Sequence, residues 1–164
     1  MSVFDTTSSS RNGECQPLLD ACTPLLYRQN AFRITGLPVD ASTRDLKRRV
    51  DDLKHAEEIG DAAAEHAHAF ALNPLPSIAH IRDAAQRLQD PERRLVDEFF
   101  WFWPAEWGKG KHDPALRALT NHDKDTPFKI WSEALAHKDA MQVAIAKHNL
   151  AVLFCGAQSP SCVT

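Results

Sequence analysis

Helix-start signals recur along this chain of 164 residues, and each is followed by apolar side chains at helical spacing. The clearest signal is at Ser42, where Asp45 three residues later forms a variant of the capping box. Leu46, Val50 and Leu53 then follow at i, i+4 and i+7, which places them on one face of a helix. No alternation of apolar and polar residues is long enough to indicate a strand. The sequence therefore predicts an all-α fold.

Further helices are predicted between Pro and Gly residues that interrupt the pattern. Ser77 is a candidate cap for a helix that ends near Leu88, and Asp90-Pro91 starts the next one, because Pro fits the first helical turn but not the interior. That helix, residues 92–103, is apolar around its circumference, so we expect neighbours to cover it on more than one side. Three more helices are predicted at residues 114–121, 127–136 and 140–154.

The pattern divides the chain into five segments. They are a flexible N-terminal tail (1–16), a helical domain (17–104), a linker (105–113), a repeat-like helical region (114–155) and an irregular C-terminal tail (156–164). The first tail is rich in Ser, Thr, Asn and Gly, a composition that cannot bury enough apolar surface to order itself.

Composition narrows the class of protein. A net charge of −3 argues against electrostatic binding of nucleic acid over a large surface, so no nucleic-acid partner is expected. The longest apolar run, residues 99–104, is far shorter than the roughly 18 residues of a membrane span, so no membrane partner is expected. The N-terminus lacks a secretory pattern and the four cysteines have no metal-type spacing, which predicts a cytoplasmic protein with free thiols.

Two stretches resemble a known family. Residues 30–42 read Asn-Ala-Phe-Arg-Ile-Thr-Gly-Leu-Pro-Val-Asp-Ala-Ser, and residues 88–94 read Leu-Gln-Asp-Pro-Glu-Arg-Arg. With the helix that starts at Ser42, they resemble the J domain of DnaJ-type co-chaperones over roughly residues 26–103. In that family a Leu-Gly turn and an Ala-Ser cap precede helix two, and an Asp-Pro junction separates helices three and four. The resemblance implies a J-like helical bundle that docks on a DnaK-class chaperone.

The chain departs from this family at the feature that gives it activity. J domains use a His-Pro-Asp tripeptide to trigger ATP hydrolysis in the partner chaperone, and the same register here holds Glu58-Ile59-Gly60. His112-Asp113-Pro114 has the wrong order and lies beyond the fourth helix. The basic residues of helix two are also matched by as many acidic ones. These departures argue against ordinary stimulation of a chaperone.

The C-terminal part resembles the entry to a helical repeat array. Residues 146–154 resemble the first helix of a tetratricopeptide repeat, in which small residues let helices pack closely. The whole chain is similar to bacterial proteins that join a degenerate J-like domain, ending in an aromatic stretch such as residues 97–104, to such repeats. One repeat helix cannot bury its own apolar face. We therefore expect α-hairpin or solenoid-type helices and self-association through the C-terminal helices. We also expect the chain to be a truncated member of a family of longer proteins.

Two sets of side chains are candidate protein-binding residues, one basic and one aromatic. They are Arg44, Lys47, Arg48 and Arg49, and Phe99, Phe100, Trp101 and Trp103. Each set also has a plainer interpretation. Acidic residues interleave the basic set, which is typical of a solvated helix face, and the aromatic set is suited to an internal core closed by Phe128 and Trp131.

No catalytic or metal-binding residue is predicted. His66 and His68 point about 200° apart on a helix, and no histidine pair has i,i+4 spacing. A metal- or ligand-binding helical domain that uses Glu65, His66 and His68, with His55 and His80 near in sequence, is one alternative function. No nucleophile has an identifiable base and no glycine-rich phosphate loop is present, so neither an enzyme nor a cofactor is expected.

The function predicted from these observations is a non-enzymatic protein–protein interaction adaptor or chaperone-associated scaffold. A second alternative is a co-chaperone that docks on a DnaK-class chaperone and regulates it without triggering ATP hydrolysis.

Overall fold

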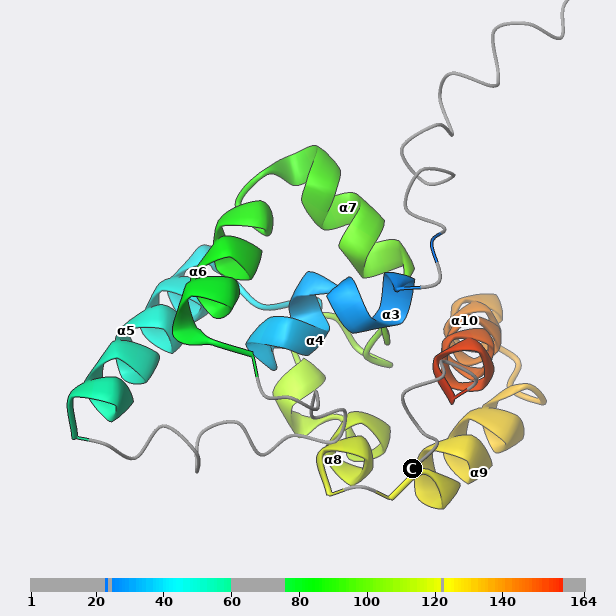
Figure 1. Ribbon diagram of the computed structural model, residues 1–164. Coiled ribbons are helices and arrows are strands. Elements are labelled where there is room, and N and C mark those ends of the chain that lie inside the picture. Colours follow the sequence, from blue (N-terminus) through cyan, green and yellow to red (C-terminus); the bar gives the residue numbers. More distant parts are fainter. Residues whose placement is uncertain (1–22, 24, 60–75, 122, 158–164) are drawn as a thin grey trace, which may run out of the picture.

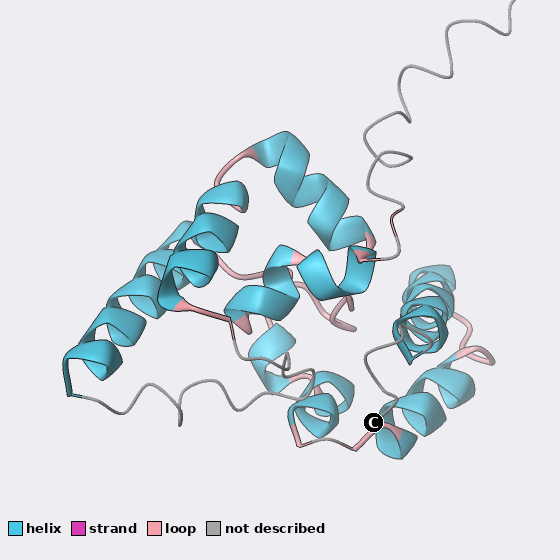
Figure 2. Ribbon diagram, viewed as in Figure 1, coloured by secondary structure: helices cyan, strands magenta, loops and turns pink. Residues whose placement is uncertain are grey.

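The computed structural model describes residue 23 and residues 25–59, 76–121 and 123–157. Within these ranges every regular element is a helix, which confirms the predicted all-α fold (Figure 1; Figure 2). None of the helices in these ranges is both long and apolar enough to cross a membrane. The elements are α3 (Leu26–Gln29), α4 (Ala31–Thr35), α5 (Thr43–Ile59), α6 (Ile78–Arg87), α7 (Pro91–Phe99), the 3₁₀ helix η2 (Gly110–His112), α8 (Pro114–Thr120), α9 (Asp125–Ala134) and α10 (Ala140–Ala157).

The capping box at the start of α5 is confirmed. The Asp45 backbone N–H donates to Ser42 Oγ at 3.2 Å, and the Ser42 backbone N–H donates to Asp45 Oδ2 at 3.0 Å. These reciprocal bonds satisfy donors that a helix start would otherwise leave without partners. The cap explains why α5 starts at Thr43. Before it, α4 ends at Gly36, whose φ of 70° favours a residue without a side chain.

The two later start signals are confirmed as well. Ser77 Oγ accepts from the His80 backbone N–H at 3.2 Å and caps α6. Asp90 Oδ1 accepts from the Glu92 N–H at 3.0 Å and caps α7, with Pro91 in the first turn. Three of the predicted helices therefore begin where their polar residues place them.

Four helices form the first part of the core. α5 and α6 run side by side in opposite directions, and α4 packs against α6 and α7 (Figure 1). The predicted stripes point inward, since Leu46 and Leu53 of α5 and Ile81 of α6 are at most 2% exposed. Phe32 of α4 is as deeply buried and lies among them.

The C-terminal helices extend the same core. α8 packs on α9, and α9 packs on α10 (Figure 1). Trp131 of α9 and Val152 and Leu153 of α10 belong to one apolar cluster with Phe32 and Leu46 from the first four helices. The division at residues 104 and 114 therefore does not separate two apolar cores within the described residues.

The predicted helix 92–103 is shorter and less buried than expected. α7 ends at Phe99, and its only buried residue is Asp97, whereas Leu95 is 64% exposed. The physical reason is that Asp97 points inward and is paired with Arg87 of α6 at 2.8 Å. Apolar side chains on the other faces of α7 therefore point toward solvent. The aromatic residues after Phe99 follow the end of the helix and do not form one of its faces.

The predicted linker 105–113 contains the short helix η2, and hydrogen bonds and an ion pair hold it to the rest of the molecule. The Gly110 N–H donates to Asp40 Oδ2 at 2.7 Å, and Lys111 pairs with Asp45 at the start of α5. Asp113 closes the segment, because its Oδ2 accepts from the Ala105 N–H at 2.8 Å while its Oδ1 caps α8.

The predicted tail 1–16 lies outside the described residues. The irregular tail predicted from residue 156 is wrong for its first two residues, because α10 continues through residues 156 and 157, and residues 158–164 lie outside the described residues. One glycine at the end of a helix was insufficient to stop it.

Candidate functional site

The aromatic stretch after α7 is mostly internal. Trp101 and Phe102 are 9% and 4% exposed, and the Phe102 ring stacks on Trp131 of α9 with centroids 5.5 Å apart. Phe100 and Trp103 are half-buried, and Phe99 is 46% exposed. The structure thus places Trp101 in the core, as the plainer interpretation expected, and leaves Phe99 as the most exposed of the four candidate aromatic residues.

Side chains of α10 hold the backbone of this aromatic stretch. Asn149, which is fully buried, accepts from the Trp103 N–H and donates to the Trp103 carbonyl, both at 2.8 Å. Gln142 donates to the Ala105 carbonyl at 2.8 Å. Backbone polar groups that leave a helix need new partners when buried, and these amides supply them. This role could not be predicted from the sequence, since Asn and Gln inside a helix have no spacing that indicates it.

His148 completes the contact between α10 and the aromatic stretch. Its ring stacks on Trp103 with centroids 4.0 Å apart, and its Nε2 lies 2.9 Å from the Trp101 carbonyl. A carbonyl only accepts, so Nε2 bears the proton of the neutral ring. Burial lowers the pKa of His148 below its ordinary value, and the bond to Trp101 partly opposes this effect. The neutral imidazole is therefore the form that fits this environment.

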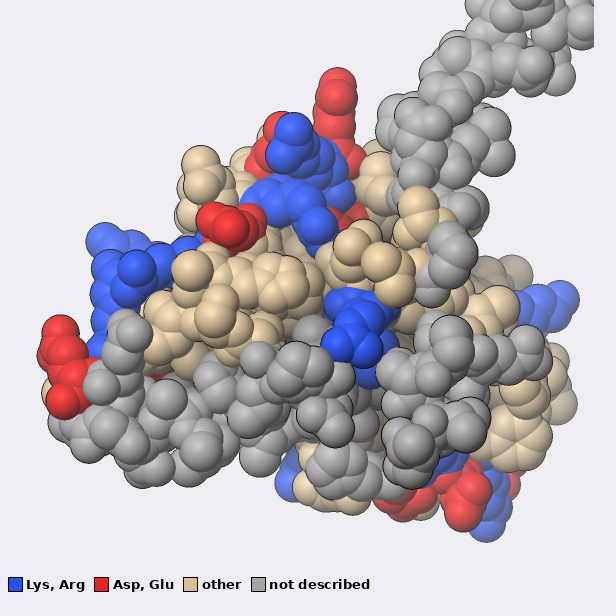
Figure 3. Space-filling model, viewed as in Figure 1, with Lys and Arg blue, Asp and Glu red and all other residues tan. Residues whose placement is uncertain are grey.

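The four candidate basic residues on α5 have different surroundings. Arg49 donates from Nε to the Thr35 carbonyl at 3.0 Å, which ties α5 to the end of α4. Arg48 lies 3.8 Å from Asp45. Arg44 and Lys47 are exposed and form no hydrogen bond or ion pair with the part of the chain that the structure describes. Figure 3 shows Lys and Arg side chains along the outer edge of α5 and acidic side chains toward its C-terminal end.

An exposed apolar surface lies on α9 and α10. Phe128 on α9, Leu135 at its C-terminal cap, and Met141 and Phe154 on α10 are each between 41% and 63% exposed. The rings of Phe128 and Phe154 meet edge to face, with centroids 6.0 Å apart, so exposed apolar side chains of the two helices are in contact at this end. We call these four residues the outer apolar surface. An exposed patch of this kind marks an interaction site more often than scattered apolar residues do.

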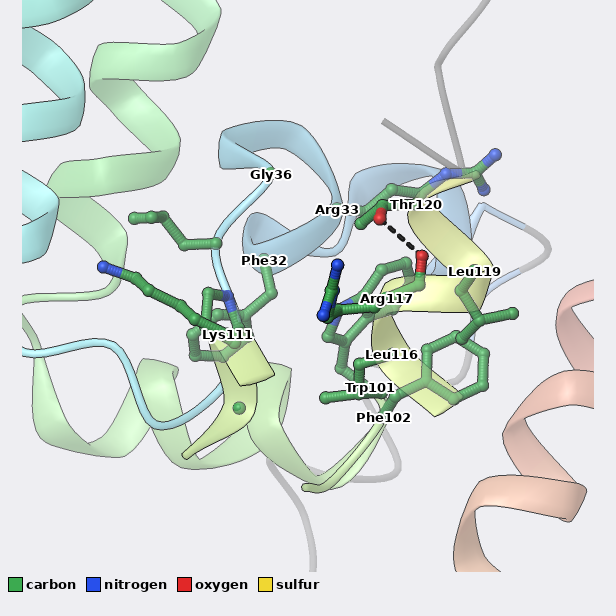
Figure 4. Close-up of a pocket in the computed structure, with 13 residues that line it drawn as sticks. Phe32, Arg33, Gly36, Trp101, Phe102, Lys111, Leu116, Arg117, Leu119 and Thr120 are labelled. Atoms are coloured by element: carbon green, nitrogen blue, oxygen red, sulfur yellow. Dashed lines mark hydrogen bonds between the residues drawn. The ribbon is translucent and has the colours of Figure 1, made fainter. Parts of the chain in front are cut away.

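A separate pocket opens between α4, η2 and α8 (Figure 4). Its volume is about 390 Å³, and apolar side chains form most of its wall. Phe32, Leu37, Trp101, Phe102, Leu116 and Leu119 line it, with Arg33, Lys111 and Arg117 around them. Sequence reasoning missed this pocket, because its wall combines residues 32–38 with residues between 101 and 120, which are distant in the chain.

A buried polar cluster joins α4, α6 and α7. Asp97 receives two bonds from Arg87, both at 2.8 Å, and one from the Ala31 N–H at 2.9 Å. Asn30 donates to the Asp97 carbonyl at 2.8 Å. Burial raises the pKa of Asp97, and the bonds from Ala31 and Arg87 oppose that rise. Since each polar atom has a partner, the cluster orients helices and offers no free group for chemistry.

No group of three His, Cys, Asp or Glu side chains is placed to hold a metal ion within residues 25–59, 76–121 and 123–157. Glu65, His66 and His68, which the metal-binding alternative requires, lie outside the described residues.

Comparison with protein families, curated proteins and solved structures finds no match for this chain.

Proposed function

We propose that this protein is a non-enzymatic adaptor that binds an amphipathic helix of another protein on the outer apolar surface. The observation that supports this most is the composition of α10. From Ala140 to Ala157 it contains one permanently charged residue, Lys147, and apolar residues occur around its whole circumference. A helix of this kind is normally covered on all sides.

The exposed side of α10 has a shape that suits another helix. At 100° per residue, one arc of the helix contains Met141, Ala144, Lys147, Ala151 and Phe154, and the structure leaves all five exposed. Small residues between large ones let a second helix approach closely and place its side chains in the gaps. An extended strand would find no unpaired sheet edge here within the described residues.

The charge on this arc indicates which helix fits. Lys147 is exposed, and it lies near the middle of the arc, six residues after Met141 and seven before Phe154. A second copy of α10 packed antiparallel about a twofold axis would bring the two Lys147 side chains together, which is unfavourable. A partner helix with an apolar stripe and a central Asp or Glu meets no such repulsion.

The proposal is tested with designed helical peptides and the full chain. A fluorescent peptide with a Leu/Ala stripe and a central Glu is titrated with the protein, and its anisotropy gives the Kd. We expect Phe154→Asp to weaken binding by about 10-fold or more, because it replaces a large apolar side chain of the contact with a charge. Leu95→Asp is the matched control, since Leu95 is 64% exposed on α7.

Three outcomes contradict the proposal. One is a Glu peptide that does not bind, and another is Phe154→Asp and Leu95→Asp having equal effects. The third is a dimer, seen by analytical ultracentrifugation, that Phe154→Asp dissociates, because it would assign the surface to self-association instead.

We propose as a second candidate that the α5 face docks on a DnaK-class chaperone without triggering it. The antiparallel α5–α6 pair with α4 packed against α6 supports a J-like arrangement, and the free cations Arg44 and Lys47 support docking. Single-turnover ATP hydrolysis by the chaperone, with and without this protein, tests the idea. We expect salt-sensitive binding that is lost in Arg44→Glu with Lys47→Glu, and no stimulation of hydrolysis.

The control protein for this experiment has His-Pro-Asp in place of Glu58-Ile59-Gly60. Two results would contradict the second candidate function. One is stimulation of ATP hydrolysis by the unmodified protein, and the other is chaperone binding that the two charge reversals leave unchanged.

A further inference from the structure

The pocket between α4, η2 and α8 has the size and wall of a small-molecule site. About 390 Å³ is within the range of pockets that bind drug-sized ligands. Three aromatic side chains, Phe32, Trp101 and Phe102, contribute to its wall from two segments about 70 residues apart. Aromatic walls favour an aromatic ligand, because rings gain energy from edge and offset contacts in addition to burial. The wall therefore favours a ligand with a flat apolar ring.

The charged residues of the pocket indicate an anion. Among the described residues no Asp or Glu lines it, and the charged residues that do are Arg33, Lys111 and Arg117. Lys111 is already paired with Asp45, and Arg33 donates to the Tyr27 carbonyl at 3.2 Å. The Arg117 guanidinium is exposed and forms no hydrogen bond or ion pair with the described residues.

Arg117 is also the cation that enters the pocket. In Figure 4 its side chain extends from α8 into the space between Phe32 and Thr120, whereas Lys111 and Arg33 direct their charged ends away from the centre. A guanidinium binds a carboxylate through two parallel N–H bonds, which fix the orientation of the ligand as well as its charge.

We propose that this pocket binds a small aromatic carboxylate, with its ring against the apolar wall that Leu37, Trp101 and Leu116 present to the opening and its carboxylate on Arg117. The site is distinct from the outer apolar surface, and the proposal does not depend on the adaptor function. The ring supplies apolar burial and the carboxylate supplies the selectivity, since a neutral ligand of the same shape leaves Arg117 without a partner.

The experiment compares 2-naphthoate with the neutral 2-naphthalenemethanol on the full chain, by calorimetric titration. We expect the carboxylate to bind about 10-fold or more tightly than the alcohol, as a charge-assisted bond implies. Arg117→Gln should remove this preference and Arg117→Lys should keep part of it, because lysine retains the charge but not the paired geometry. Arg82→Gln is the matched control, since Arg82 is an exposed cation on α6 that does not line the pocket.

Backbone amide NMR shifts locate the ligand independently of the charge variants. We expect the signals of Gly36, Leu116 and Thr120, which line the pocket, to move on addition of 2-naphthoate. Equal affinities for the two ligands would overturn the proposal. So would a preference that Arg117→Gln leaves unchanged, shifts confined to other residues, or the absence of binding by 2-naphthoate at its solubility limit.

Discussion

Asn149 shows how one buried side chain fixes the path of a segment without regular structure. Both of its amide atoms bond the backbone of Trp103, and its side chain is completely enclosed. His148 and Gln142 bond the carbonyls of Trp101 and Ala105 from the same helix. The aromatic stretch and α10 are therefore positioned by each other, and a change to Asn149 affects both.

Asn149→Leu is expected to reduce the free energy of unfolding by about 1–3 kcal/mol, because it leaves the half-buried N–H and carbonyl of Trp103 without partners. Gln142→Ala removes a single, more exposed bond, so we expect a loss within about 1 kcal/mol. Urea unfolding of both variants measures the difference. Equal losses in the two variants would mean that the amide pairing at Trp103 contributes little.

The pH dependence of stability should contain a contribution from His148. Its pKa is lowered in the folded state from the ordinary 6.5, so below that pH the unfolded chain binds more protons than the folded one. Stability is therefore expected to fall as the pH drops below 6.5 toward the lowered value. His148→Gln, which cannot titrate, should show a shallower fall in its urea midpoint between about pH 7.5 and pH 5.5. Identical slopes would contradict this assignment.

At the scale of elements, the sequence predicted where helices begin better than where they end. Ser42, Ser77 and Asp90 each cap the helix that follows them, because a cap is a local interaction that adjacent residues determine. The predicted end of α7 was wrong, because it depends on two contacts between distant elements. Asp97 pairs with Arg87 of α6, and Asn149 of α10 bonds the backbone of Trp103. Neither contact leaves a mark in the local sequence.

The same reasoning applies to the candidate sites. Exposure of Arg44 and Lys47 on α5 follows from helical periodicity and was expected. The burial of Trp101 and the position of Arg117 in a pocket depend on how distant elements meet, so composition and spacing could not reveal them.

The contact between η2 and the start of α5 is close enough to test by adding one methyl group. A Cβ at Gly110 would overlap the Asp40 carboxylate. The carboxylate must then move away from the Gly110 N–H that it accepts from, so Gly110→Ala is expected to destabilise the protein by about 1–1.5 kcal/mol. In an Asp40→Ala background the obstruction is gone, so the added cost should fall below about 1 kcal/mol. A double-mutant cycle from urea unfolding measures this coupling, and strictly additive effects would contradict the contact.

At the scale of the whole molecule, one apolar cluster extends from α4 to α10. Phe102 stacks on Trp131, and both belong to the cluster that contains Phe32 and Leu153. We expect the chain to unfold in a single transition, with coincident urea curves by far-ultraviolet circular dichroism and by tryptophan fluorescence. Two separated transitions would instead support the predicted division into a domain at 17–104 and a repeat-like region at 114–155.

The adaptor function depends on the outer apolar surface and on Lys147 near the middle of the α10 arc. If Lys147 selects an acidic partner helix, reversing its charge should reverse the selection. The most direct measurement is therefore the binding of two peptides that differ only in a central Glu or Lys, each to the unmodified protein and to Lys147→Glu. We predict that the unmodified protein prefers the Glu peptide and that Lys147→Glu prefers the Lys peptide. The same preference in both proteins, or none in either, would contradict the account.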